Sequence, residues 1–269
     1  MALKDITLGQ YFPGNSPVHR LDPRTKILTV VLYITALFLA KSFVTYGIMF
    51  LVLCASIALS KVPVKSILRG LKPVLFIAVV TAVLNLLYTP GEHVLAKFWI
   101  FTITLEGVFT AFFMVIRIMM LIAGTFLLTY TTSPILLTDG LESLLGPLKK
   151  LKVPVHELAM MMSIALRFIP TLIEETDKIM SAQRARGADF ESGNLMQRAK
   201  AMIPLLVPLF ISAFRRADEL AMAMECRCYH GGEGRTRLRQ LKYGGNDWTA
   251  LILFLGITAA VGVLGRFGL

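Results

Sequence analysis

The chain has 269 residues, of which 55% are hydrophobic and only 17% are charged, and its formal net charge is +11. Soluble domains average about 25% charged residues, so this composition excludes a disordered chain and is hard to reconcile with a soluble domain. A surplus of positive charge often indicates nucleic-acid binding. Here the basic residues lie beside apolar runs, as they do in the cytoplasmic loops of membrane proteins. We therefore expect an integral membrane protein that contacts the lipid bilayer and binds no nucleic acid.

Five apolar runs predict transmembrane helices, because a helix needs about 20 residues to cross a bilayer and fewer when flanking lysines reach the interface. The runs are 27–40, 43–60, 73–88, 105–130 and 248–265. Lys41 and Ser42 predict a tight turn between the first two, and Trp248 is an interfacial anchor for the last. The predicted fold class is an all-α, polytopic membrane protein with about five transmembrane helices and long cytosolic amphipathic coupling helices.

The distribution of basic residues predicts the orientation in the membrane. Arg20, Arg24 and Lys26 precede the first run, four more basic residues separate the second run from the third, and residues 131–246 hold sixteen. The 41–42 turn and the 89–104 loop carry one lysine each. This asymmetry places the N-terminus and residues 131–246 in the cytoplasm and the C-terminus outside.

The predicted organisation therefore has four parts. They are a cytosolic N-terminal segment (1–26), transmembrane helices 1–4 (27–130), cytosolic coupling helices (131–246) and a C-terminal transmembrane helix (247–269). The cell membrane of a prokaryote is the expected location.

Residues 131–246 are too charged for a bilayer core, yet apolar residues recur there at helical spacing. We expect helices over 134–151, 155–186 and 195–229, with Pro170 bending the second and Gly187 ending it. Helices this apolar outside a bilayer bury one face and offer the other to a partner.

Two of these helices end on an arginine between small residues. Ala185, Arg186 and Gly187 lie at the first end, and Cys226, Arg227 and Cys228 at the second. A guanidinium group binds a carboxylate through two parallel hydrogen bonds, which lysine does not match. The alternative is that each arginine only complements the helix dipole.

Other chemistry is weakly represented in the sequence. Cys226-x-Cys228-x-His230 resembles metal ligands, but zinc takes four and no second pair exists, so no metal site is predicted. Arg117 lies inside an apolar run with Glu106 as its nearest acidic residue, and it either serves a function there or packs against carbonyls or another helix. The sequence has no P-loop, no Gly-x-Ser-x-Gly elbow and no His-Glu-x-x-His helix, so we expect neither an enzyme nor a cofactor.

Three stretches together carry a family resemblance. They are Gly9-Gln10-Tyr11-Phe12-Pro13 with Ser16 and His19–Lys26, Arg167–Pro170 with Ala182–Gly187, and Ala223–Arg227. The chain resembles the transmembrane T component of energy-coupling factor transporters, which import vitamins and transition-metal ions. This T component is related to the Q component of cobalt importers. The resemblance covers nearly the whole length.

The resemblance implies a non-enzymatic scaffold that holds two cytosolic ATP-hydrolysing subunits and one substrate-binding integral-membrane subunit. It also implies that the two arginine ends, Ala185–Gly187 and Cys226–Cys228, lie in grooves of the ATPases. The second end departs from the family pattern, because Cys226 and Cys228 replace an alanine and a glycine.

Two further classes remain as alternatives to the scaffold. One is a self-sufficient secondary transporter or channel, which usually shows broken helices and ionisable residues near the midplane; only Arg117 fits that description. The other is a membrane enzyme, for which the apolar runs offer no constellation of polar residues.

Overall fold

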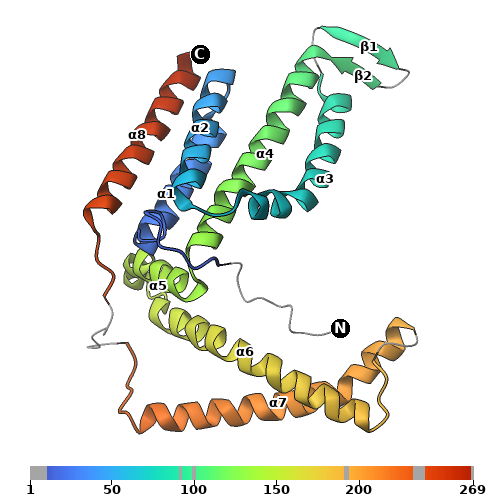
Figure 1. Cartoon of the computed structure of the whole chain (residues 1–269), viewed down its shortest axis with the longest axis vertical. Helices are drawn as coiled ribbons and strands as arrows, with labels where there is room; N and C mark the ends of the chain where they lie inside the picture. Colours follow the sequence, from blue (N-terminus) through green and yellow to red (C-terminus); the bar gives the residue numbers. More distant parts are fainter. Residues whose placement is uncertain (1–10, 91–92, 99–100, 191–193, 233–239, 268–269) are drawn as a thin grey trace. The chain divides into compact units, whose positions relative to one another are not determined.

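The computed structural model describes residues 11–90, 93–98, 101–190, 194–232 and 240–267 (Figure 1). Gly9 and Gln10, the first residues of the N-terminal motif, lie outside the described residues. The chain divides into two compact units. Residues 9–141 with 241–269 form one, here named the bundle unit, and residues 142–240 form most of the other, here named the arm unit.

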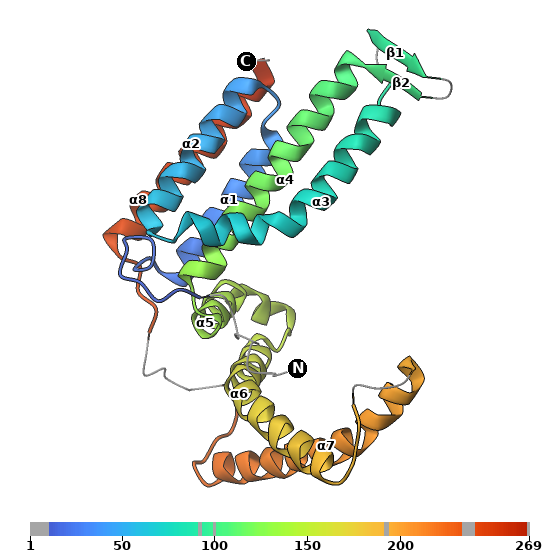
Figure 2. The same ribbon diagram turned by 45° about the vertical axis from the view of Figure 1, so that its right-hand side comes forward.

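Within the described residues, the bundle unit consists of long helices and one short hairpin. The helices are α1 (Pro23–Leu39), α2 (Phe43–Ser60), α3 (Val64–Tyr88), α4 (Leu105–Thr131) and α8 (Gly245–Phe267), and the strands are β1 (Val94–Phe98) and β2 (Phe101–Thr104). The strands pair antiparallel between α3 and α4. Figures 1 and 2 show α1 beside α4 and α8, and α1 contacts both of them. Helix α5 (Pro134–Leu144) spans the boundary to the arm unit.

Local sequence signals explain where the first helices begin. The Asp22 carboxylate accepts a hydrogen bond from the Arg24 amide at 2.9 Å, and Pro23 occupies the first turn, where its missing N–H costs nothing. Ser42 and Thr45 form a reciprocal capping box at the start of α2. The predicted turn between the first two apolar runs is therefore confirmed.

The core of the bundle unit is built from buried residues of α1, α2, α3, α4 and α8. Leu37 and Val261 are fully buried there, beside the nearly buried Tyr33. The Tyr33 hydroxyl donates to the Met120 carbonyl at 3.3 Å, and a Cβ on Gly124 would lie 2.5 Å from the Tyr33 ring. Only glycine therefore lets α4 approach α1 this closely.

The outside of the bundle unit is apolar. Phe38, Phe50, Phe76, Phe112 and Ile252 are each at least half exposed. Exposed apolar surface on this scale marks contact with lipid or another protein. Within the described residues, five helices are long and apolar enough to cross a membrane, namely α2, α3, α4, α6 (Val155–Ala185) and α8. The predicted all-α, polytopic membrane fold is confirmed.

Four of the five apolar runs that were predicted to cross the membrane correspond to helices of this set, namely α2, α3, α4 and α8. The first run does not. Helix α1, which covers the predicted run 27–40, has 17 residues and is shorter than the others. Helix α6 replaces it and is the least apolar of the five. The location of α6 outside the membrane therefore stays a prediction.

Helix boundaries differ from the predicted ones at several places. Helix α3 begins at Val64 instead of residue 73, because the basic stretch that precedes the apolar run is helical as well. The helix predicted over 134–151 stops at Leu144 and continues as the 3-10 helix η2 (Gly146–Leu151), whose first turn holds a proline without an N–H to donate. Helix α7 (Leu195–Glu225) ends a few residues before the predicted residue 229.

The arm unit is formed chiefly by α6 and α7, which cross in both views (Figures 1 and 2). Each helix has 31 residues. Pro170 lies inside α6, and Pro204 and Pro208 lie inside α7. These two helices are here named the arms. Because an internal proline removes one backbone hydrogen bond, each arm bends more easily at its prolines than elsewhere along its length.

Candidate functional site

Helix α6 ends in a closed turn that places Arg186 directly before a left-handed residue. Gly187 has a φ of +90°, and its amide donates to the Arg184 carbonyl at 2.9 Å. The Ala188 amide donates to the Gln183 carbonyl at 3.0 Å. These two hydrogen bonds are the Schellman motif, which satisfies the last carbonyls of a helix and favours glycine at the left-handed position.

Helix α7 ends in the same way, with Arg227 before the left-handed residue. Cys228 has a φ of +54°, and its amide donates to the Glu225 carbonyl at 2.8 Å. The Tyr229 amide donates to the Met224 carbonyl at 3.1 Å. The hydrogen-bond pattern matches that of α6 residue for residue, although a cysteine takes the place of glycine.

The two helix ends are therefore equivalent in backbone geometry as well as in sequence. A left-handed conformation costs an L-residue other than glycine roughly 1–2 kcal/mol. Cys228 bears that cost, and Gly187 does not. The sequence showed that both arginines lie between small residues, but it did not show that Cys228 adopts the conformation that Gly187 adopts.

All six predicted site residues are exposed, namely Ala185, Arg186, Gly187, Cys226, Arg227 and Cys228. Within the described residues, the side chains of Arg186 and Arg227 form no ion pair with an acidic group. Each guanidinium group is thus presented at an exposed helix end with no ion pair to an acidic side chain of the described part of the chain. A carboxylate from another molecule is the chemical group that a guanidinium binds best, through two parallel hydrogen bonds.

The two arms are joined to each other where they cross. The Glu175 carboxylate on α6 forms an ion pair with Arg216 on α7 at 2.7 Å, and it also accepts a hydrogen bond from the Ser212 hydroxyl. Nearer the end of α6, the Gln183 side-chain amide lies 3.5 Å from the Pro204 carbonyl. The sequence analysis did not single out Arg216, because nothing in its local sequence indicates a partner on another helix.

The chain after α7 returns to the start of α6. A Cβ on Gly232 would lie 2.5 Å from the His156 ring, so glycine is required for this close approach. His156 Nδ1 in turn lies 3.0 Å from the Glu142 carboxylate. Both ends of the arm unit are thus fixed near the first turn of α6.

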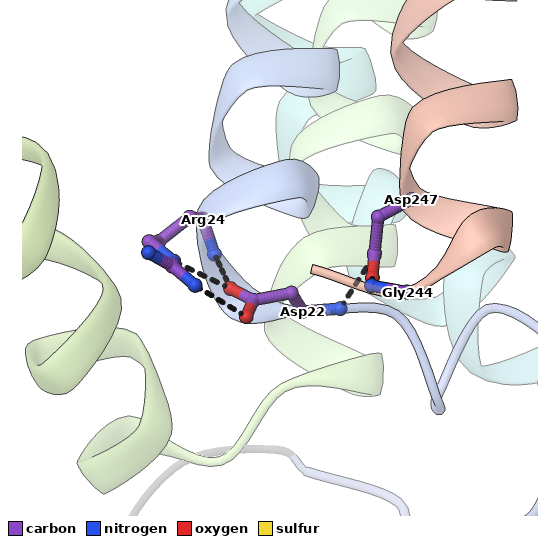
Figure 3. A network of polar contacts seen from close by, with 4 residues as sticks. All are labelled: Asp22, Arg24, Gly244 and Asp247. Atoms are coloured by element: carbon purple, nitrogen blue, oxygen red, sulfur yellow. Dashed lines mark hydrogen bonds and ion pairs between the residues drawn. The ribbon is translucent and has the colours of Figure 1, made fainter. Parts of the chain in front are cut away.

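In the bundle unit, the N-terminal motif forms a network with the start of α8 (Figure 3). The Asp22 amide donates to one carboxylate oxygen of Asp247 at 2.8 Å, and the Gly244 amide donates to the other at 2.7 Å. Arg24 forms a two-pronged contact with the Asp22 carboxylate, with both hydrogen bonds at 3.0 Å. Asp22 and Asp247 are both buried.

The same motif also holds the end of α4. The Lys26 ammonium group donates to the carbonyls of Thr131 and His19, at 2.9 and 3.1 Å. The Arg24 guanidinium lies 4.0 Å from the centre of the Tyr243 ring, a distance that gives a cation–π contact. Thr131, the first residue of the predicted coupling segment, and Asp247, the residue that follows it, are therefore both attached to one short stretch at the start of α1.

Arg117 is occupied by structural contacts. Its Nε donates to the Tyr46 hydroxyl at 2.8 Å, and one terminal nitrogen donates to the Ala40 carbonyl at 3.2 Å. Glu106 instead accepts a hydrogen bond from the His93 amide at 3.4 Å. Of the two interpretations of Arg117, the structure supports packing against a carbonyl and a neighbouring helix.

The Cys-x-Cys-x-His stretch lies on an exposed helix end. Among the described residues there is no group of three or more histidine, cysteine, aspartate or glutamate side chains that could hold a metal ion. Cys226 and Cys228 are free thiols on the surface. Their small size matters to the helix end, because it keeps the flanks of Arg227 open.

The fold and the paired helix ends define the class: a polytopic α-helical membrane protein that presents two equivalent arginine-bearing helix ends. The family model described as cobalt transport protein (CbiQ) matches residues 14–238, and the chain belongs to this family. It is a multi-pass membrane protein of a transport family.

Curated relatives match along nearly the whole chain, and each is named energy-coupling factor transporter transmembrane protein EcfT. The relative from Acidaminococcus fermentans is 55% identical over 268 residues, which is 99% of both chains. The relative from Thermosediminibacter oceani is 56% identical over 265 residues, covering 98% of this chain and 99% of its own. The Bacillus subtilis relative is 51% identical over 259 residues, covering 96% and 97%.

Proposed function

We propose that this chain is the transmembrane scaffold of an ATP-driven importer of a vitamin or metal ion. In this role it couples ATP hydrolysis by two cytosolic subunits to a substrate-binding subunit in the membrane. The names of the relatives support the transporter, and the observation that carries the two-subunit part is the matched pair of helix ends at Arg186 and Arg227.

Each arginine binds a carboxylate in a groove of one ATPase. The small neighbours, Ala185 and Gly187 at one end and Cys226 and Cys228 at the other, let the groove walls approach the backbone. When the two ATPases close on ATP, they move the two helix ends together. The chain itself catalyses no reaction in this proposal, because hydrolysis occurs in the partner subunits.

The crossing of the arms makes them move as a pair. Because Glu175 on α6 contacts both Ser212 and Arg216 on α7, a displacement of one helix end pulls on the other arm. The prolines inside each arm allow limited bending without breaking this contact.

We further propose that the arm unit lies in the cytoplasm, together with the N-terminus, and that the C-terminus is external. The least apolar of the five candidate membrane-spanning helices, α6, belongs to this unit, and the basic residues of 131–246 favour the cytoplasmic side. Reporters fused after Gln240 and after Leu269 should then report opposite sides of the membrane. Reporters on the same side would contradict this orientation.

Affinity purification of the tagged chain in mild detergent tests the scaffold. Two P-loop ATPase subunits per chain, identical or different, should be recovered, and a membrane protein without such a motif should accompany them. A chain that purifies alone and moves a substrate across liposomes would overturn the proposal in favour of a self-sufficient transporter. The residue that favoured that alternative, Arg117, is held by Tyr46 and Ala40.

A further inference from the structure

A basic segment joins α2 to α3 in the bundle unit. Its basic residues are Lys61, Lys65, Arg69 and Lys72, and all four side chains are exposed. The sequence has no acidic residue between Asp22 and Glu92. Within the part of the chain that the structure describes, none of the four pairs with an acidic group. Among the described residues, no acidic side chain therefore neutralises the charge of this segment.

The first turns of α3 have three distinct faces. Ile67 and Leu71 are buried, and a Cβ on Gly70 would lie 2.6 Å from the Phe126 ring of α4. This close contact fixes one face of the segment against α4. The rotation of the other side chains about the helix axis is fixed with it.

The basic and apolar residues on the outer side form separate strips. At 3.6 residues per turn, Lys65, Arg69 and Lys72 fall within an arc of about 60°. Val64 and Leu68 lie between this arc and the buried face, and their side chains are 56% and 61% exposed. An exposed apolar strip beside a basic strip is the pattern of a helix at a membrane surface, where apolar side chains enter the acyl region and basic ones meet the phosphates.

The course of α3 agrees with a position at the membrane surface. Figures 1 and 2 show α3 starting across its neighbours and then turning to run alongside α4. Pro73 lies inside the helix directly after the basic residues, and a proline at such a place removes one backbone hydrogen bond and bends the helix. The basic turns can thus lie along the interface while the rest of α3 enters the apolar layer.

We propose that the turns Val64–Lys72 form a binding surface for anionic phospholipid headgroups. Lys65, Arg69 and Lys72 bind the phosphates, and Val64 and Leu68 enter the acyl region beside them. This surface needs only the bilayer as partner. The lipid-binding proposal can therefore be tested independently of the ATPase-docking function.

Native mass spectrometry of the full-length chain in mild detergent tests the surface. The purified chain is incubated with equal amounts of phosphatidylglycerol and phosphatidylcholine, and the retained lipids are counted. The wild-type chain should retain phosphatidylglycerol preferentially. The triple variant Lys65→Gln/Arg69→Gln/Lys72→Gln should lose this preference by about tenfold or more, since each basic residue near an anionic surface contributes severalfold to binding.

Two controls separate a binding surface from a general effect of charge. The variant Lys149→Gln/Lys150→Gln/Lys152→Gln removes the same charge from the arm unit and should keep the wild-type preference. The variant Lys65→Arg/Lys72→Arg keeps the charge and should also keep it. If the triple variant does not fold, each single glutamine variant should lower the preference severalfold.

Equal retention of the two lipids by the wild-type chain would overturn the proposal. So would a folded triple variant with unchanged preference for phosphatidylglycerol. If this face instead binds a protein subunit, the triple variant will keep its lipid preference and lose a co-purifying protein.

Discussion

At the scale of single residues, Arg186 and Arg227 carry the proposed coupling. Both occupy the position before a left-handed residue, so both point from a closed helix end with the same backbone geometry. Truncating one partner of a buried charge pair costs about 2–5 kcal/mol, much of it from the carboxylate left unpaired. Reversing the charge adds repulsion to that cost.

The variant Arg186→Glu/Arg227→Glu should therefore release the ATPases while the chain still inserts in the membrane. Each single reversal should abolish most transport, and each lysine variant should fall between wild type and reversal, because lysine keeps the charge but not the fork. Co-purification of the ATPases and substrate uptake by cells measure both effects. Full uptake by the double variant would end the docking proposal.

The left-handed residues give a second prediction, about stability. Cys228→Gly should stabilise the chain by up to about 1 kcal/mol, because glycine adopts a positive φ without steric cost. Gly187→Cys should destabilise it by a similar amount. A Cβ at Gly187 would meet no atom within 4 Å, so the loss would report the backbone alone. Thermal unfolding in detergent measures both, and shifts of the same sign in the two variants would contradict the assignment.

At the scale of elements, the Glu175–Arg216 pair determines whether α6 and α7 act together. The pair is partly exposed, so its own contribution to stability is about 0.2–1 kcal/mol. Its proposed importance is mechanical, because Glu175 is the residue through which one arm contacts two side chains of the other.

We expect Glu175→Gln to lower transport severalfold with little change in thermal stability. Glu174→Gln is the matched control, because the neighbouring carboxylate is exposed and removing it makes the same change in charge. Combining Glu175→Gln with Arg216→Gln should cost less than the sum of the two single changes. Additive losses, or an equal effect of Glu174→Gln, would show that the pair does not join the arms.

The helices could be predicted from the sequence where their signals are local. The apolar run 43–60 matches α2, and Gly187 was expected to end α6. The start of α3 was missed because the prediction followed the apolar run from residue 73, whereas the helix already includes the basic residues before it. Contacts between distant segments were missed for another reason: the Asp22–Asp247 hydrogen bond joins residues 225 positions apart, and no local pattern reports such a pairing.

At the scale of the whole molecule, the start of α1 holds both connections to the predicted coupling segment. Lys26 binds the end of α4 through Thr131, and Asp22 binds the start of α8 through Asp247. The chain enters the segment after the first contact and leaves it before the second. In the proposed mechanism, motion of the arms is passed on along these two chain connections, and both are anchored to the same turn.

Asp247→Asn should weaken this anchor, because an asparagine offers one acceptor oxygen to two backbone amides, the buried one of Asp22 and the more exposed one of Gly244, and places an NH₂ group against one of them. Leaving a buried donor unsatisfied costs about 1–3 kcal/mol. We expect a lower unfolding temperature and, with the ATPases still bound, less substrate transported per ATP hydrolysed. Asp218→Asn, the same change at an exposed site on α7, should leave the unfolding temperature unchanged. If Asp247→Asn lowers stability but leaves transport per ATP at the wild-type value, the anchor supports the fold and does not transmit the motion of the arms.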